Sequence, residues 1–303
     1  MAANSVQAAP VGLAVTISAS AAKGAAVAAS ITTLVQGTLK IMTYAKLKLA
    51  IGISAGILLA GGAATVAVSG GSGSGDDLPT SEIFKKAQEK YASLTSYSDE
   101  GKTVATLNGS TITTTFTIRL ARPNFYRIEW EQSSESAFST TKNKKQAVWS
   151  AGDGDFLEMG RGAEKQKSKE LALSGATGIS SGAAATVPGN FFKMNWGNQL
   201  GGSVLSEKRQ ADEKVGDVDC YVFTSELKGT TKTIWIGKQD FLIHQIRNVT
   251  SAEAMKAALA EAAKRHPEIA ARRGNREPQG ITSTETHANI VVNQKFSPSD
   301  FAR

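Results

Sequence analysis

A single uncharged run constrains this chain more than any other part of its sequence. It extends from Leu49 to Ser69, follows two closely spaced lysines, and leads into a stretch of Gly and Ser over residues 70–75. At about 1.5 Å of rise per residue, a helix of this length covers a bilayer's hydrocarbon core of roughly 30 Å. We therefore predict a transmembrane helix over residues 46–69, followed by a Gly/Ser linker over residues 70–79.

Two alternatives to a retained membrane anchor stay open for this run. Gly and Ala are frequent in it, so its hydropathy is weak for a transmembrane segment, and a buried helix or a cleaved signal sequence would also fit. The position of the run argues against a simple secretory signal, because such signals occupy the first 15–30 residues or so. The retained anchor is the prediction that we carry forward.

The charges on either side of the run predict its orientation. No acidic residue precedes it, and Asp76 and Asp77 follow it; the lysines before it are Lys23, Lys40, Lys46 and Lys48. Because basic flanks stay on the cytoplasmic side, we expect a single-pass protein with its N-terminus in the cytoplasm and its C-terminal domain on the other side of the membrane. Residues 1–45 are Ala-rich and of low complexity, which is typical of a cytoplasmic tail. This composition leaves open that the chain is a fragment of a longer protein.

The net charge of +7 does not indicate a nucleic-acid binder. Four of the positive charges precede residue 49, and a further excess of two comes from residues 251–280. A nucleic-acid-binding domain needs basic residues gathered on its folded surface. What remains of this chain is nearly neutral, so we expect no nucleic-acid partner.

From residue 80 onward the spacing of apolar residues is first helical and then strand-like. Residues 82–94 place apolar side chains three and four residues apart, which predicts an amphipathic helix. Residues 110–121 then alternate, with Ile112, Phe116 and Leu120 on one face. Further strands are predicted at 125–131, 136–141, 146–150, 155–159, 204–210, 218–227, 231–237, 241–249 and 284–292. We predict one mainly β (α+β) domain over residues 80–303, in which covering helices lie on an antiparallel sheet.

Two segments interrupt this strand pattern. Ser174 to Ala185 is rich in Gly, Ala and Ser, which predicts a flexible loop. Asn190 to Trp196 carries four large apolar residues without alternation, which predicts a short helix or lid over an apolar surface. Later, Thr250 and Glu253 have the spacing of a capping box, and we expect them to open a helix within a basic insert at 251–280.

The residues that could act in catalysis or bind a metal do not form a recognisable site. Gly178 to Gly182 fits the G-x-S-x-G motif of serine hydrolases, but no β-branched strand leads into it. His244, His266 and His287 lack the paired spacing of metal ligands. Cys220 is the only cysteine, so no internal disulfide can form, and its alternating surroundings predict a buried thiol. We expect no catalytic residue, no metal and no cofactor.

Large apolar side chains are concentrated in the predicted sheet and the predicted lid. A packed core is the ordinary explanation, and a concave sheet that encloses an apolar ligand cavity is the alternative. The pattern of residues does not separate the two. The candidate cavity residues are Phe116, Tyr126, Ile128, Trp130, Phe138, Trp149, Phe192, Trp196, Tyr221, Phe223 and Trp235.

Within the predicted anchor, Gly52 and Gly56 form a G-x-x-x-G pair. Small residues at this spacing let two membrane helices approach closely, which would give a weak dimer. Small residues are so frequent in the run that a chance match explains the pair better than dimerisation does.

The order of several segments adds a resemblance to a known family. These segments are a helix end, a strand-to-strand turn, a strand start, a hairpin and a C-terminal strand: Tyr91–Tyr97, Arg122–Arg127, Gly216–Tyr221, Thr233–Arg247 and Asn289–Asn293, with Phe301 after them. In this order and spacing they resemble the periplasmic lipoprotein carrier and sorting proteins of the LolA type and the related RseB sensor domain. The resemblance covers residues 82–250 and 284–303. More weakly, residues 8–69 resemble the membrane-anchored C-terminal extension of some bacterial sigma factors.

The resemblance implies a fold and a class of ligand. It implies an antiparallel sheet curled into an incomplete barrel, covered by helices, whose apolar cavity takes up the acyl chains of a lipid or lipoprotein. This chain differs from the soluble carriers by its predicted tether and by the basic insert before the last strand. The hypothesis is a membrane-anchored, non-enzymatic binding domain. Together with the resemblance, the predicted anchor implies a single-pass protein of the inner (cytoplasmic) membrane with its C-terminal domain in the periplasm. The alternative is an envelope-stress sensor coupled through the anchor to a cytoplasmic transcription partner.

Overall fold

The computed structural model describes residues 78–303 except 108–109, 137–138, 143–144, 160–161, 202–206 and 266–276. The predicted anchor, its Gly52 and Gly56, the tail and nearly all of the linker lie outside the described residues. Within the described part of the chain, the structure contains no helix that is both long enough and apolar enough to cross a bilayer.

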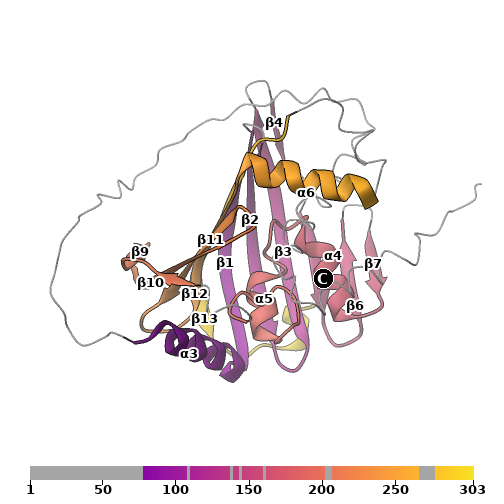
Figure 1. Ribbon diagram of the computed structural model, residues 1–303. Helices are drawn as coiled ribbons and strands as arrows, with labels where there is room; N and C mark the ends of the chain where they lie inside the picture. Colours follow the sequence, from indigo (N-terminus) through magenta and orange to yellow (C-terminus); the bar gives the residue numbers. More distant parts are fainter. Residues whose placement is uncertain are drawn as a thin grey trace, which may run out of the picture.

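Thirteen strands form one sheet, with a small number of helices against it (Figure 1). The strands are β1 (Ser96–Leu107), β2 (Ser110–Ala121), β3 (Phe125–Ser136), β4 (Ser139–Lys142), β5 (Gln146–Ser150), β6 (Asp155–Glu158), β7 (Ala163–Gln166), β8 (Lys208–Arg209), β9 (Glu213–Val215), β10 (Val218–Leu227), β11 (Thr230–Gly237), β12 (Ile243–Thr250) and β13 (Ile281–Val292). The helices are α3 (Thr80–Ser93), α4 (Lys169–Thr177), α5 (Thr186–Phe191), α6 (Ala252–Arg265) and the 3-10 turn η2 (Pro298–Asp300).

The sheet is antiparallel and open. Its order is β7-β6-β5-β3-β2-β1-β13-β12-β11-β10-β8, with β4 paired to β3 and β9 to β10, so β7 and β8 are its two ends. The last strand, β13, lies in the middle, between β1 and β12. The prediction of a mainly β, antiparallel and unclosed sheet with helices against it is confirmed.

Alternation along each strand separates the two faces of the sheet. In β2, Thr114, Phe116 and Ile118 are buried, whereas Thr113, Thr115 and Thr117 face the other side and are more exposed. The same period in β3 buries Tyr126, Ile128 and Trp130. The face that carries these apolar residues is the one that the helices cover, and it holds the main hydrophobic core.

We call residues 169–200 the helical cover. It consists of α4, a tight turn, α5 and the segment after α5, and Figure 1 shows α4 and α5 in front of the sheet. The prediction of a flexible loop at 174–185 is wrong, because α4 extends to Thr177 and the turn after it is buried at Ser180, Ala183 and Ala184. Small side chains let this backbone lie close to the sheet. The sequence pattern that suggested mobility is therefore a pattern of close packing.

Two further helices confirm their predicted places, with one correction. Helix α3 buries Ile83, Phe84 and Tyr91, and the Phe84 ring meets that of Phe223 edge-on at 4.9 Å. Helix α6 begins at Ala252, but its cap is Ser251, whose hydroxyl accepts a hydrogen bond from the Ala254 N–H at 3.0 Å. The predicted capping box at residue 250 is wrong, because that threonine pairs across the sheet with Thr230.

Candidate ligand-binding interior between the sheet and the helical cover

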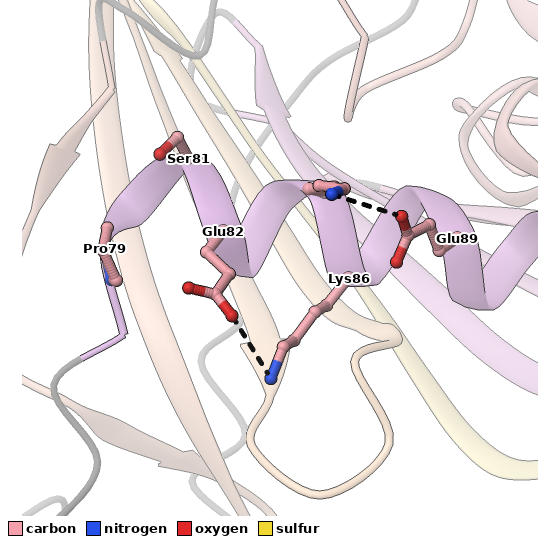
Figure 2. A pocket seen from close by; sticks show the side chains of 6 residues that line it. Pro79, Ser81, Glu82, Lys86 and Glu89 are labelled. Atoms are coloured by element: carbon pink, nitrogen blue, oxygen red, sulfur yellow. Dashed lines mark ion pairs between the residues drawn. The ribbon is translucent and has the colours of Figure 1, made fainter.

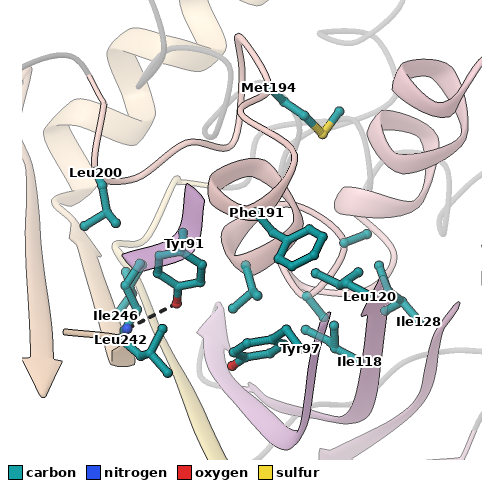
Figure 3. Packing of buried hydrophobic residues seen from close by; sticks show 14 of the residues in the cluster. Tyr91, Tyr97, Ile118, Leu120, Ile128, Phe191, Met194, Leu200, Leu242 and Ile246 are labelled. Carbon is teal, nitrogen blue, oxygen red and sulfur yellow. Dashed lines mark hydrogen bonds between the residues drawn. The ribbon is translucent and has the colours of Figure 1, made fainter. Parts of the chain in front are cut away.

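The main core is built from the sheet, the helical cover and α3. Figure 3 shows the Phe191 ring of the cover next to Leu120 of the sheet, and Met194 of the cover belongs to the same cluster. The cover also contributes Leu173, Ala176, Ala184 and Val187 to the same cluster. If the cover moved away, the apolar face of an open sheet would be uncovered.

Most of the candidate cavity residues come together in this interior. Six of them belong to the core cluster, and two from the cover, Phe192 and Trp196, are partly buried against it; the six are Phe116, Tyr126, Ile128, Trp130, Tyr221 and Phe223. The ring of Phe192 meets that of Tyr126 edge-on, with centroids 6.2 Å apart. The side chain of Phe138 lies outside the described part of the structure.

Trp149 and Trp235 are placed on the opposite face of the sheet. In β5 the inward residue is Val148, so Trp149 points the other way and stacks on Phe156 at 5.4 Å. Trp235 joins a second small core with Cys220 and its neighbours on β10. The aromatic character of a residue does not reveal which face it occupies; the register does.

Arg122 ties the helical cover to the end of α3. Its Nε donates to the carbonyl oxygen of Leu94 at 2.9 Å, and its Nη2 donates to that of Phe191 at 2.8 Å. The guanidinium also lies 4.6 Å from the centre of the Phe191 ring. A cation at the C-terminal end of α3 is favourable because the last carbonyls of a helix lack intrahelical partners. One side chain therefore holds three segments together.

The interior also holds a buried ionic group that the sequence analysis missed. The Nδ1 of His287 lies 2.6 Å from Oδ2 of Asp99, and its Nε2 lies 3.2 Å from Oε1 of Glu285. The Tyr97 hydroxyl donates to Asp99 at 2.7 Å. Burial by itself would lower the pKa of His287, but the two carboxylates outweigh it and raise this pKa to about 10. The imidazole is therefore charged at neutral pH.

The helical cover meets this polar part of the sheet through two sets of hydrogen bonds. The Ser181 hydroxyl lies 2.7 Å from that of Thr114, and Gln132 donates to both. The Thr186 hydroxyl, at the start of α5, donates to Oε2 of Glu285 at 2.9 Å. Gly182 lies between them with a φ of +106°, and a Cβ there would be 2.7 Å from Oε2 of Glu285. The cover thus approaches the sheet by backbone as well as by side chain.

The G-x-S-x-G segment does not have the geometry of a nucleophile elbow. The Ser180 hydroxyl is buried and accepts a hydrogen bond from the Ala184 N–H at 3.1 Å. Both histidines of the described residues are engaged elsewhere, His287 with Asp99 and His244 with Asp240 at 2.9 Å. Within the described residues, no three His, Cys, Asp or Glu side chains are grouped to hold a metal ion.

Two hollows on the surface are lined mainly by polar groups. One, of ≈ 380 Å³, lies along α3, where Lys86 and Glu82 pair at 3.7 Å and Lys85 and Glu89 at 3.8 Å (Figure 2). The other, of ≈ 150 Å³, adjoins the bulge of β1 near Asp99. Their charged linings differ from that expected of a site for an apolar chain.

Comparison with known proteins finds similar solved structures at low sequence identity. No family model and no curated protein matches the chain. Among solved structures, LprF from Mycobacterium bovis is similar with a TM-score of 0.41 and 7% identity, covering 72% of this chain and 94% of that one. MucB in the MucA/MucB complex of Pseudomonas aeruginosa has a TM-score of 0.36 and 10% identity, covering 74% of this chain and 60% of that one. This chain therefore spans about three fifths of that MucB structure.

A further similar structure is an outer membrane lipoprotein-sorting protein domain from Vibrio parahaemolyticus. Its TM-score is 0.28 and its identity 8%, and the match covers 73% of this chain and 95% of that one. The solved structures similar to this chain therefore include MucB and a lipoprotein-sorting protein domain.

Proposed function

We propose that this chain is a membrane-anchored, non-enzymatic binding domain that holds acyl chains, free or carried by a lipoprotein, between its sheet and its helical cover. The observation that carries the proposal is the shared core, in which residues of the cover such as Phe191 and Met194 occupy the apolar face of an open sheet. A ligand chain would take the place of these side chains when the cover moves.

An acyl chain would bring a large transfer free energy to such an exchange. Each buried methylene contributes about 0.8 kcal/mol, so a chain of about 14 carbons supplies roughly 10 kcal/mol of transfer free energy. The cover's own apolar contacts would be lost in exchange, together with its few polar contacts to the sheet. Those contacts are the Thr114, Gln132 and Ser181 group, Thr186 with Glu285, Arg122 with Phe191, and Lys169 with Asn124. Moving the cover therefore breaks a short, identifiable set of bonds.

A reversible disulfide between cover and sheet tests the proposal. The hydroxyl oxygens of Thr114 and Ser181 are 2.7 Å apart, so a Thr114→Cys, Ser181→Cys pair in a Cys220→Ser background places two thiols in reach of each other. We expect the full-length protein to lose labelling by a photoactivatable fatty acid when oxidised and to regain it on reduction. The two single-cysteine variants are the controls. Equal labelling of the oxidised and reduced forms would rule out entry beneath the cover.

The same proposal includes the anchor and its orientation. A helix over residues 46–69 with its basic flank in the cytoplasm would keep the domain at the outer surface of the inner membrane. A tethered domain acts locally and does not shuttle between membranes. Cysteine labelling from each side of the membrane, at introduced sites in residues 1–45 and at an exposed site of the domain, tests this orientation. Labelling of both regions from the same side would contradict it.

A further inference from the structure

The inward face of the sheet carries a row of buried polar residues across four neighbouring strands. Register places Gln132 opposite Thr114, Thr114 opposite Thr103, and Thr103 opposite Glu285. All four are buried beneath the helical cover or within the core. Side chains opposite one another in such a row have Cβ atoms about 4.5–5.5 Å apart. The row is therefore continuous, and Asp99 and His287 adjoin it on β1 and β13.

Most hydrogen-bond donors of this region are already engaged; Nε2 of His287 and the Thr103 hydroxyl have no partner with hydrogen-bond geometry. Gln132 donates to Thr114 and Ser181, Thr186 to Glu285, and Tyr97 to Asp99. The Nδ1 of His287 faces Asp99, and its Nε2 lies within ion-pair distance of Glu285. A ligand entering here would find few free N–H or O–H groups.

Acceptor atoms, by contrast, remain unused. Oδ1 of Asp99 and Oγ1 of Thr103 are buried and have no hydrogen-bond partner among the described residues. Oε1 of Glu285 has no partner with hydrogen-bond geometry either, although Nε2 of His287 is 3.2 Å away. Buried polar atoms without partners are rare in folded proteins and call for a water, an ion or a ligand group. Here the unused atoms include two carboxylate oxygens.

We propose that this polar row receives the head group of the bound amphiphile, and that the head group is a primary ammonium. The inference rests on the proposed acyl-chain function, because it assigns the polar end of the same ligand. An ammonium brings N–H donors to the unpartnered oxygens of Thr103 and Glu285, which are opposite each other on β1 and β13. Its positive charge also offsets the net negative charge left by two carboxylates and one imidazolium. A phosphate head would be repelled by the two carboxylates, and the donors without a partner that it would meet are the Thr103 hydroxyl and Nε2 of His287, which already lies 3.2 Å from Oε1 of Glu285.

Competition among amphiphiles of one chain length tests the head-group assignment. Dodecylammonium, dodecanol and dodecyl phosphate compete with a photoactivatable dodecyl probe for the full-length protein, each below the concentration at which it forms micelles. We expect dodecylammonium to compete at a concentration at least about tenfold lower than dodecyl phosphate, the factor given by one well-formed charge-assisted hydrogen bond.

Two substitutions connect the preference to the row. Thr103→Val keeps the shape of the side chain and removes a hydroxyl that has no partner, so stability should be unchanged or higher. Glu285→Gln removes a carboxylate charge. We expect either substitution to reduce the ammonium-to-phosphate preference to about threefold or less. Thr115→Val, on the opposite face of β2, is the matched control and should keep the preference.

The outcomes separate this inference from the function on which it rests. If none of the three amphiphiles competes, the acyl-chain function itself is wrong. If dodecanol competes but dodecylammonium does so no better than dodecyl phosphate, the function stands and the row holds only water. If the preference exists but Thr103→Val and Glu285→Gln leave it intact, the head group binds elsewhere and the inference is overturned.

Discussion

The imidazole of His287 and the carboxylate of Asp99 are 2.6 Å apart in the protein interior, although 188 positions separate them in the chain. They connect β1, the first strand in the chain, to β13, the last strand, which lies between β1 and β12 in the middle of the sheet. A buried charge is tolerated only when it is paired and hydrogen-bonded. The contact therefore makes the central strand pairing specific for this register.

Stability should depend on pH through His287. Its pKa in the folded protein, about 10, is above the value of about 6.5 expected in the unfolded chain. The stabilisation is therefore complete below about pH 6.5 and is lost as the pH rises through 10. We expect His287→Gln to lower the free energy of unfolding by about 3–5 kcal/mol at about pH 6, and by much less at about pH 10.5. Urea denaturation of both proteins at the two pH values measures this, and an equal deficit at both would contradict it.

Removing both partners should be milder than removing the histidine alone. A lone buried carboxylate is costly, whereas a neutral pair of similar volume is tolerated. We expect Asp99→Asn combined with His287→Gln to be more stable than His287→Gln alone at about pH 6. A double variant that is less stable than the single one would mean that the two side chains do not act as a pair.

Arg122 should control how readily the helical cover opens. Arg122→Lys keeps the charge but loses the planar fork that reaches the carbonyls of Leu94 and Phe191 together. We expect a loss of about 1–3 kcal/mol in the free energy of unfolding. We also expect amide hydrogen exchange to become faster than in the unsubstituted protein, and more so in α5 than in β2. Arg119→Lys on β2 is the control and should change stability by less than about 0.5 kcal/mol. Unchanged exchange in α5 would show that the arginine does not hold the cover.

Gly182 should be required by its position against Glu285. An alanine there combines a φ of +106° with a Cβ only 2.7 Å from Oε2, so Gly182→Ala should destabilise by about 2–4 kcal/mol. Gly216→Ala is the matched control, because its φ is +60° and a Cβ there meets nothing within 4 Å. The control should lose only about 1 kcal/mol from the backbone conformation. Similar losses in thermal denaturation would show that contact with Glu285 is unimportant.

The sequence predicts the sheet but not its pairing. Alternation alone assigned the inward faces of β2 and β3 and so grouped Phe116, Tyr126 and Trp130 correctly. It did not assign Trp149, since a short strand between turns can start on either face. The ionic group was missed for a different reason. Asp99 and His287 each occupy ordinary inward positions in alternating strands, and only the long-range pairing of β1 with β13 brings them together.

The helical cover shows the limit of composition as a guide. Gly, Ala and Ser between residues 174 and 185 are typical of a loop, yet here they permit close backbone approach, with Ala183 and Ala184 fully buried. The signal that could have revealed this is the run of apolar residues on both sides of the segment, from Leu171 to Phe192. A flexible loop has no need of such flanks.

Cys220 should be nearly unreactive in the folded protein. Burial raises the pKa of its thiol to about 12, and Trp235 and Val222 pack around it in the second core. Because the thiolate is the reactive form, only about one thiol in ten thousand would be ionised at pH 8 even if it were accessible. We expect reaction with an aromatic disulfide reagent to be limited by unfolding, so that its rate rises with urea in step with the unfolding rate. Rapid reaction in native buffer would mean that the β8–β10 region opens locally, and the small second core would then be a weak point of the sheet's edge.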